Sequence, residues 1–192
     1  KLKKTKCYVT RKGLNPVDGT VVIGEVDSYE TERHELVLKA HIVKEIGYKD
    51  AVGMDILMIL HQLKIPTVFP DSVIEEANRV SETISPEEIE GRVDLRQELT
   101  VTIDGADAKD LDDAVALVKR EDGTFVLTVS IADVSYYVTE NSEMDKEAFE
   151  RGTSVYLTDR VVPMLPQRLS NGICSLHPYE ERLTLTARME ID

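Results

Sequence analysis

TVTIDGADAKDLDDAVALV, residues 100–118, is the stretch that decides the fold of this chain. Two apolar runs, 100–103 and 114–118, enclose a polar loop that holds five aspartates. The runs predict two strands, the first closed by Asp104 and the second begun by Asp113. Carboxylates packed into so short a loop repel one another, and a hard cation such as Mg²⁺ or Mn²⁺ relieves that repulsion. The loop therefore indicates metal-assisted chemistry on a phosphate.

The aspartates of this loop are candidate metal ligands, because two-metal hydrolysis needs several carboxylates around ions about 3.5–4 Å apart. In an extended loop Asp110 and Asp112 point the same way, and Asp113 points to the other face. A solvated acidic turn is the alternative interpretation of such a charge run. An EF-hand would need a different order of acids, and a glycosidase would need only a pair of carboxylates. Spacing alone leaves the metal site and the solvated loop open.

Length, charge and cysteine usage limit the class of protein. The 192 residues suffice for one substantial domain, or for a small domain with part of another. The net charge of −13 argues against a protein that coats itself with nucleic acid, so RNA would need a local basic groove, metal ions or both. The longest apolar stretch, 56–60, is far too short to span a bilayer. Cys7 and Cys174 form no disulfide framework, which favours a reducing, intracellular setting.

Both ends of the sequence have features of a cut chain. It begins at Lys1 without a methionine and ends at Asp192 within the alternating apolar–polar run 183–191. We therefore expect a fragment of a longer protein. The first 13 residues carry no acid and six basic residues: Lys1, Lys3, Lys4, Lys6, Arg11 and Lys12. This stretch is either a solvated arm or the strand edge of a nucleic-acid groove.

Residues 1–50 have the composition of β structure. Branched apolar residues dominate 21–26 and 35–43, a polar connection is expected at 27–34, and 15–19 has the chemistry of a turn. Such short strands predict part of a small β-barrel and are too few to close one.

Residues 51–90 change to a helical pattern, which predicts a connector between two β-containing units. Asp55 is the expected cap of a first helix that Pro66 ends, and a second helix is expected over 71–80. Ser85, followed by proline, marks the start of a third.

Residues 91–192 are predicted to form a mixed α/β unit. Strands are expected at 114–119 and 125–131, and a helix is expected between a Ser142 cap and a Gly152 end. The fold class is therefore α+β: a partial β-barrel segment, a helical connector and a second β-containing unit.

The aspartate loop resembles the active-site signature of the ribonuclease II / ribonuclease R family of 3′→5′ exoribonucleases. The matching pattern is Asp104-x5-Asp110-x-Asp112-Asp113, preceded by Thr102-Ile103. Further segments fit the ribonuclease R branch of the family: GMDIL at 53–57, GRVDLR at 91–96, IADVS at 131–135, RGTSVYL at 151–157, PMLP at 163–166 and LSNGICSL at 169–176. The resemblance covers roughly residues 45–192 and implies that 91–192 is the N-terminal part of an RNB catalytic domain. The β segment at 1–50 resembles the later part of a cold-shock domain, which makes it a partial OB-type β-barrel segment.

The resemblance implies a role for five residues. In that family four aspartates hold Mg²⁺ at the scissile phosphate, and the matching positions are Asp104, Asp110, Asp112 and Asp113. Asp107 matches no family ligand and is expected to be a solvent-exposed acid. Tyr156 matches a tyrosine that packs against nucleotides near the 3′ end and helps to set the final product length. Taken without the family, Tyr156 is an ordinary strand tyrosine, for which a place in the core is expected.

The implied function is a processive, metal-dependent 3′→5′ exoribonuclease that hydrolyses single-stranded RNA to nucleoside 5′-monophosphates. Mg²⁺ or Mn²⁺ is the implied cofactor, the cytoplasm the expected location, and no membrane partner is expected. The family places a catalytic arginine and an S1-type RNA-binding domain downstream of these motifs, so the isolated chain is expected to be inactive. A non-catalytic OB-type RNA-binding module and a structural cation-binding domain are the alternatives.

A few other residues have two interpretations each. Asp133 follows an apolar strand and either reaches the site or accepts hydrogen bonds at the strand end. Arg168 and Arg182 are candidates for phosphate contacts or for surface ion pairs. His177 is interpreted as a loop histidine, with a ligand role as the alternative.

Overall fold

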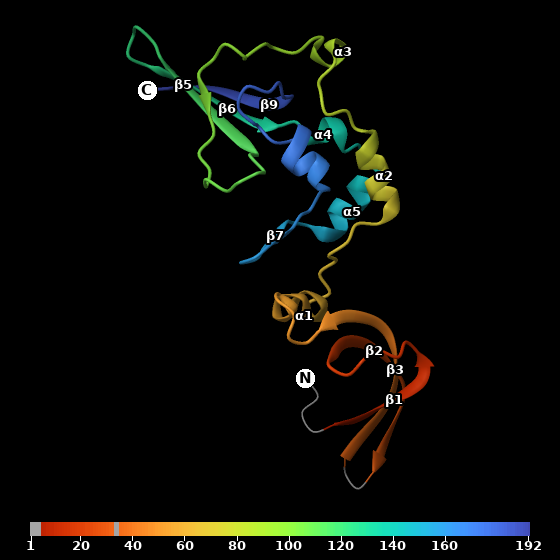
Figure 1. Cartoon of the computed structure of the whole chain (residues 1–192). Coiled ribbons are helices and arrows are strands. Elements are labelled where there is room, and N and C mark those ends of the chain that lie inside the picture. The colour runs from red at the N-terminus through yellow and green to blue at the C-terminus, as the bar shows by residue number, and fades with distance from the viewer. Residues whose placement is uncertain (1–4, 33–34) are drawn as a thin grey trace. The chain divides into compact units, whose positions relative to one another are not determined.

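The computed structural model describes residues 5–32 and 35–192 and divides the chain into two units, Lys1–Ile65 and Pro66–Asp192. Figure 1 follows the chain through both units, each of which is described by itself below. The predicted α+β class is confirmed, because the N-terminal unit combines a β-sheet with one short helix and the C-terminal unit combines β-sheets with several. Among the described residues, no helix is both long and apolar enough to cross a membrane.

The N-terminal unit is built on a three-stranded sheet. Its strands are β1 (Lys6–Gly13), β2 (Thr20–Glu32) and β3 (Glu35–Tyr48), in the order β1-β3-β2. β2 and β3 are antiparallel, and β1 runs parallel to β3 at one edge. The basic N-terminal stretch thus contributes an edge strand, although three of its basic residues lie outside the described part of the chain: Lys1, Lys3 and Lys4.

β2 is longer than expected, and the predicted polar connection at 27–34 is wrong. β2 continues to Glu32, which pairs with Glu35 at the start of β3, and residues 33–34 lie outside the described part. The polar end of the strand is stable because its backbone groups are paired with β3. In addition, Lys39 Nζ donates to Glu30 Oε1 at 2.9 Å across the two strands.

A turn and a helix complete the N-terminal unit. The turn predicted at 15–19 is confirmed, and Gly19 takes a φ of 89°, where a Cβ would lie 2.6 Å from a neighbouring aromatic ring. Helix α1 spans Met54–Gln62. The predicted cap is wrong, because Gly53 occupies the N-cap with a φ of 76° and Asp55 lies in the first turn. There the Asp55 carboxylate stabilises the helix through its dipole.

The helices of the C-terminal unit are α2 (Asp71–Arg79), α3 (Pro86–Ile89), α4 (Val134–Tyr137) and α5 (Glu143–Arg151). The predicted start of α3 is confirmed by a capping box of Ser85 with Glu88. The predicted ends of α5 are confirmed too, since Ser142 Oγ accepts the first-turn N–H of Asp145 at 3.1 Å and Gly152 has a φ of 72°. α2 packs against α5 (Figure 1), and the core beneath them contains Val73, Ala77, Ala132, Met144, Leu169, Ile173 and Cys174.

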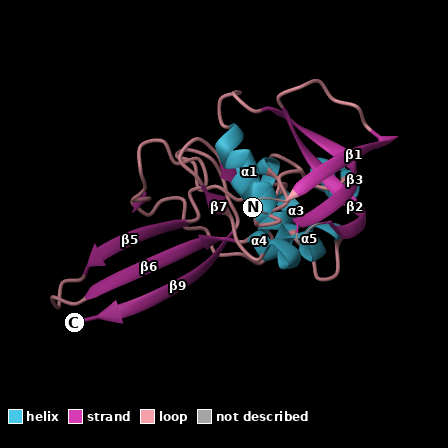
Figure 2. Ribbon diagram, turned by 90° about the horizontal axis from the view of Figure 1, so that it is seen from below, coloured by secondary structure: helices cyan, strands magenta, loops and turns pink. Residues whose placement is uncertain are grey.

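A four-stranded antiparallel sheet carries the aspartate loop. Its order is β4 (Thr100–Val101), β5 (Asp113–Lys119), β6 (Phe125–Ala132) and β9 (Thr184–Ile191). Figure 2 shows β5, β6 and β9 side by side, and the start of β5 at an aspartate is as predicted. A strand pair and a π-helical turn lie between β6 and β9 in the chain: β7 (Val155–Tyr156), β8 (Val161–Val162) and η1 (Leu169–Ile173).

The strand predicted at 100–104 is shorter than expected, and Asp104 does not close it. β4 ends at Val101, which pairs with Val115 of β5. If β4 continued for three more residues in the same antiparallel register, Asp104 would lie directly opposite Asp112. Like charges in that position destabilise a sheet, so the chain leaves the ladder before the acids meet.

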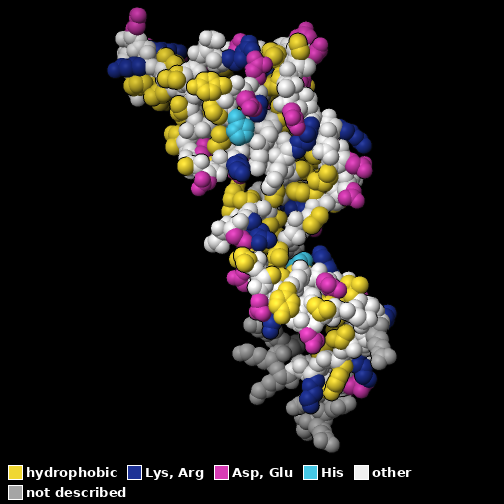
Figure 3. Space-filling view, in the orientation of Figure 1, with side chains coloured by type: hydrophobic (Ala, Val, Ile, Leu, Met, Phe, Trp, Pro, Cys, Tyr) yellow, Lys and Arg dark blue, Asp and Glu magenta, His cyan; other side chains and the backbone are white. Residues whose placement is uncertain are grey.

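The smaller side chains of the sheet lie on its buried face: Ala114, Ala116, Thr128 and Ser130. Larger apolar side chains on the opposite face are exposed, among them Leu117, Ile131, Leu185 and Met189, and Figure 3 shows hydrophobic side chains gathered over these strands. The buried face is covered by the segment 94–100. Within it, Glu98 accepts from Thr128 Oγ1 at 3.3 Å and pairs with Arg188 at 3.1 Å. A cavity of about 920 Å³ lies along this contact.

Candidate active site on the aspartate loop

The aspartate loop spans residues 102–112 between β4 and β5, and hydrogen bonds from two other segments hold its C-terminal end. The Leu176 N–H donates to the Leu111 carbonyl at 2.8 Å, and the Ala132 N–H donates to the Asp112 carbonyl at 3.0 Å. The loop backbone is therefore fixed where its acids are densest. These two carbonyls are satisfied by segments that are distant in the sequence.

The predicted ligands share one electrostatic environment, with Asp112 at its centre. Partial burial raises the pKa of the Asp112 carboxyl, and nearby negative charges raise it further. These charges belong, in decreasing order of effect, to Asp110, Asp113 and Asp104. Asp107, by contrast, lies exposed in a turn at the tip of the loop. Burial and the three neighbouring carboxylates therefore act on Asp112 in the same direction.

Among the described residues, no group of three or more His, Cys, Asp or Glu side chains is arranged to hold a metal ion. The four aspartates thus share a charge environment without converging into a ligand set. Their donor chemistry fits Mg²⁺ or Mn²⁺, because both ions take carboxylate oxygens. The crowding around Asp112 also fits, since a divalent cation would neutralise the charge that raises its pKa. The residues that would hold such an ion are Asp104, Asp110, Asp112 and Asp113.

Tyr156, on β7, reaches the aspartate loop. Its hydroxyl donates a hydrogen bond to the Asp110 carboxylate, and this bond is the main cause that raises the pKa of Tyr156 to about 12. The residue is 63% exposed, so the expectation of a core tyrosine is wrong. An exposed ring that is tethered at its hydroxyl can still offer a face to a nucleotide base.

Of the two interpretations of Asp133, the structure supports hydrogen bonding at the end of the strand and not a place among the acids of the aspartate loop. It is only 5% exposed, accepts from Arg92 Nη2 at 2.9 Å and accepts from Ser135 Oγ at 3.0 Å. The Arg92 guanidinium also lies 5.2 Å from the centre of the Tyr136 ring. This ion pair ties the segment before β4 to the end of β6.

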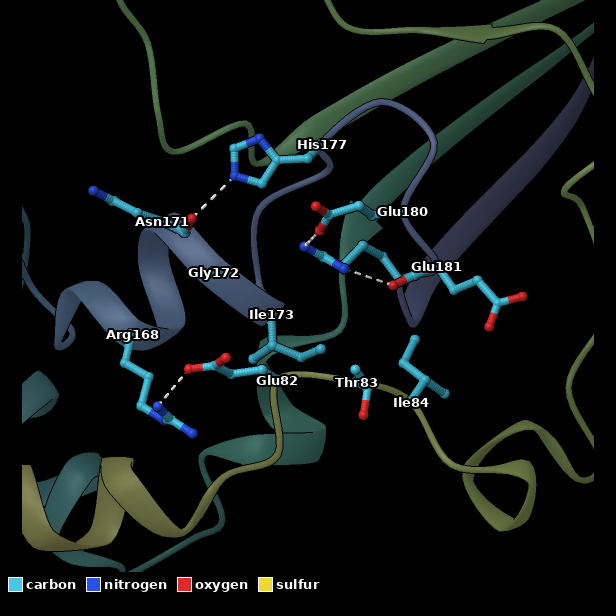
Figure 4. Close-up of a pocket in the computed structure, with 11 residues that line it drawn as sticks. Glu82, Thr83, Ile84, Arg168, Asn171, Gly172, Ile173, His177, Glu180 and Glu181 are labelled. Atoms are coloured by element: carbon cyan, nitrogen blue, oxygen red, sulfur yellow. Dashed lines mark hydrogen bonds and ion pairs between the residues drawn. The ribbon is translucent and has the colours of Figure 1, made fainter.

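A separate cavity of about 640 Å³ lies beside η1 (Figure 4). Both of its arginines are paired, Arg168 Nη1 with Glu82 at 2.6 Å and Arg182 with Glu180. His177 Nε2 lies 3.0 Å from a backbone carbonyl of η1. The arginines therefore form the predicted ion pairs, and the paired carboxylates leave the cavity without an excess of positive charge for a phosphate.

Sequence reasoning missed Ser175. This residue is fully buried, and its hydroxyl bonds to the backbone of the aspartate loop. The available signal was a serine within the apolar segment LSNGICSL, residues 169–176, because a buried hydroxyl requires a partner.

Comparisons with known proteins identify related sequences. A profile described as the RNB domain matches residues 92–192, and one described as a cold shock domain matches residues 1–70. Ribonuclease R 1 of Lactococcus lactis is 51% identical over 186 residues, which are 97% of this chain and 23% of that protein. Ribonuclease R of Thermotoga maritima is 51% identical over 156 residues, 80% of this chain and 22% of that protein. The chain thus spans less than a quarter of the length of these relatives.

Solved structures share the fold. The structure titled Mycoplasma genitalium RNase R in complex with double-stranded RNA matches with a TM-score of 0.89 at 33% identity, over 98% of this chain and 33% of that one. Yeast Ssd1, described as a pseudonuclease, matches with a TM-score of 0.65 at 20% identity over 91% of this chain and 22% of that one, which shows the fold alone. The RNB match covers more than half of the sequence and includes the aspartate loop and Tyr156. The chain therefore belongs to the RNB domain family.

Proposed function

We propose that the protein is a metal-dependent 3′→5′ exoribonuclease that processively hydrolyses single-stranded RNA to nucleoside 5′-monophosphates. The observation that carries this proposal is the crowding of three carboxylates around Asp112 within the RNB-matched segment. The ribonuclease R names of the relatives support the reaction, and the structures of Mycoplasma genitalium RNase R in complex with RNA support the substrate. Because a pseudonuclease shares the fold, the aspartates and not the fold support cleavage.

We propose that Asp104, Asp110, Asp112 and Asp113 hold Mg²⁺, or Mn²⁺ in its place. The chemistry that such an ion supplies when bound is polarisation of the scissile phosphate and activation of a water. Tyr156 stacks on a base near the 3′ end, while its hydroxyl bond to Asp110 links β7 to the aspartate loop. Stacking accepts every base, which suits cleavage without sequence preference.

We also propose a division of the chain into three parts: a cold-shock or OB-type segment at 1–50, a helical connector at 51–90 and the N-terminal part of an RNB catalytic domain at 91–192. The cold shock match over 1–70 and the RNB match from residue 92 support the two outer parts. Helices α1, α2 and α3, which lie between residues 54 and 89, support the connector.

A cytoplasmic location stays a prediction from cysteine chemistry. Cys7 and Cys174 are both free thiols. Burial raises the pKa of the Cys174 thiol to about 12, so it stays protonated and unreactive. Free thiols of this kind are usual in reducing compartments.

A non-catalytic OB-type RNA-binding module is the second candidate function. Tyr8 on β1 is 58% exposed and Tyr29 on β2 is 75% exposed, and exposed aromatic rings on strands are common stacking platforms for single-stranded nucleic acid. The cold shock match covers both residues. This candidate predicts RNA binding without cleavage.

Removal of divalent metal tests the proposed function. In the full-length protein we expect labelled single-stranded RNA to be cut to nucleoside 5′-monophosphates with Mg²⁺, to stay intact with EDTA and to be cut again when Mn²⁺ is added. RNA that is bound with a steep salt dependence but never cut would instead support the binding module. A metal that raises the melting temperature of a protein unable to bind RNA would indicate a structural cation site.

Replacement of Tyr156 tests the stacking role. Tyr156→Ala is expected to weaken binding of the RNA 3′ end and to leave longer final products, because a stacked base contributes about 1–3 kcal/mol. Tyr156→Phe keeps the ring, loses the bond to Asp110 and is expected to leave product length unchanged. Denaturing gels of the final products compare both with Tyr179→Ala, which removes a fully exposed tyrosine outside the site. Identical product lengths for Tyr156→Ala and the unmodified protein would refute the stacking role.

A further inference from the structure

We propose that Ser175 is a positioning residue that holds the aspartate loop in the arrangement needed for metal binding, an inference that rests on the proposed function. Ser175 lies two residues after the end of η1 in the sequence, its N–H donates to a carbonyl of η1, and it is 0% exposed. Its Oγ accepts a hydrogen bond from the Leu111 N–H at 3.0 Å and donates one to the Lys109 carbonyl at 2.9 Å. One hydroxyl therefore satisfies the two backbone groups on either side of Asp110.

Ser175 is itself held in place by its neighbours. Its carbonyl accepts from Arg182 Nε at 2.8 Å, and the Arg182 side chain is only 8% exposed. The next residue, Leu176, donates its N–H to the Leu111 carbonyl at 2.8 Å. The Ser175 carbonyl also accepts the His177 N–H at 2.9 Å, so both of its lone pairs are engaged, and the hydroxyl is the acceptor for the Leu111 N–H. The loop is thus attached through a side chain that can be altered without changing any aspartate.

The loop is held from a second direction as well, since the Ala132 N–H donates to the Asp112 carbonyl at 3.0 Å. The two attachments restrict the backbone between Asp110 and Asp112, whose carboxylates repel each other. Without the Ser175 hydroxyl, two loop backbone groups lose their partner, and repulsion favours separation of the acids. Residues that orient metal ligands from behind commonly change metal affinity by about 10–100-fold when altered.

Mn²⁺ binding by a Ser175→Ala variant of the full-length protein tests this role. Electron paramagnetic resonance of free Mn²⁺ gives the dissociation constant without reference to activity. We expect it to rise about 10–100-fold, and the Mn²⁺ midpoint of RNA cleavage to rise by the same factor. Ser142→Ala is the matched control, because that hydroxyl also accepts a backbone N–H, from Asp145 at 3.1 Å, but caps α5. In Ser142→Ala the dissociation constant for Mn²⁺ is expected to stay within about twofold of the value for the unmodified protein, because the cap does not contact the loop.

An unchanged Mn²⁺ dissociation constant in Ser175→Ala would overturn the positioning role, whatever happens to the melting temperature. If that variant does not fold, Ser175→Cys carries the same test, because a thiol is similar in size and a poor hydrogen-bonding group. A raised constant then supports the role and an unchanged one overturns it.

Asp112→Asn separates the two proposals. If this variant loses Mn²⁺ binding and cleavage while Ser175→Ala is unaffected, only the positioning role fails; if it still cuts RNA, the proposed function fails.

Discussion

Asp112→Asn in the full-length protein is expected to lower the rate of RNA cleavage by about 10²–10³-fold or more, the range for loss of one charge-stabilising group in an active site. RNA binding is expected to stay near normal, because the substitution removes a negative charge and no stacking or basic group. Cleavage of labelled RNA under single-turnover conditions and filter binding in EDTA measure the two effects. Equal loss of binding and cleavage would point to misfolding in place of lost catalysis.

The same substitution is also expected to change the thermal stability of the protein, and the direction of that change serves as an internal control. Burial and the neighbouring acids raise the pKa of folded Asp112 above its ordinary value of 3.8. The carboxyl therefore favours the folded state most below pH 3.8, and that contribution is lost as pH rises through the raised pKa. In EDTA at pH 7, Asp112→Asn is expected to melt at a higher temperature than the unmodified protein, with the difference shrinking as the pH is lowered toward 3.8. A lower melting temperature at pH 7 would contradict the crowding of charge at this position.

Arg151→Met is expected to destabilise α5 and its surroundings by about 3–5 kcal/mol, the usual cost of breaking a buried ion pair from one side. The Arg151 side chain is 3% exposed, and its Nε donates to Glu147 at 2.8 Å. Its two Nη atoms donate to the carbonyls of Pro66 at 3.0 Å, Val68 at 3.0 Å and Pro163 at 3.2 Å. The guanidinium also lies 3.7 Å from the centre of the Phe69 ring. Methionine fills similar space but leaves Glu147 and three carbonyls without this donor.

Hydrogen exchange of the α5 amides in the full-length protein measures this loss, because it reports local opening without requiring two-state unfolding. Arg79→Met on α2 is the control. Arg79 forms an ion pair at the same i,i+4 spacing, 4.0 Å from Glu75, but the two side chains are 77% and 71% exposed. Its removal is expected to change stability by less than about 0.5 kcal/mol. Equal protection of α5 in both variants would show that the buried guanidinium network contributes no more than a surface pair.

Local signals in the sequence predicted several elements correctly. Ser85 and Ser142 cap helices where the capping patterns indicate, and Gly152 ends α5. The strands expected at 114–119 and 125–131 are β5 and β6. Each of these features depends on residues close together in the chain, so its physical cause is visible in a short window of sequence.

Predictions failed where pairing between strands or coverage by another segment decides the outcome. The polar residues 27–32 form a strand because β3 lies alongside to pair with them, and Thr102 to Asp104 leave the sheet because the register with β5 would oppose two aspartates. The buried face of the C-terminal sheet is the one covered by the segment 94–100, although the opposite face has the larger apolar side chains. Neither pairing partners nor covering segments follow from the local pattern.

The sequence by itself determined the composition of the site, since five aspartates between two apolar runs require a loop with an excess of negative charge. It also determined the family through motifs that keep their order along the chain. The tertiary structure alone decided which side chains hold that loop. Asp110 meets Tyr156 across 46 residues, and Leu111 meets Ser175 across 64. Such contacts form only after packing brings separate elements together, so no local pattern of residues reveals them.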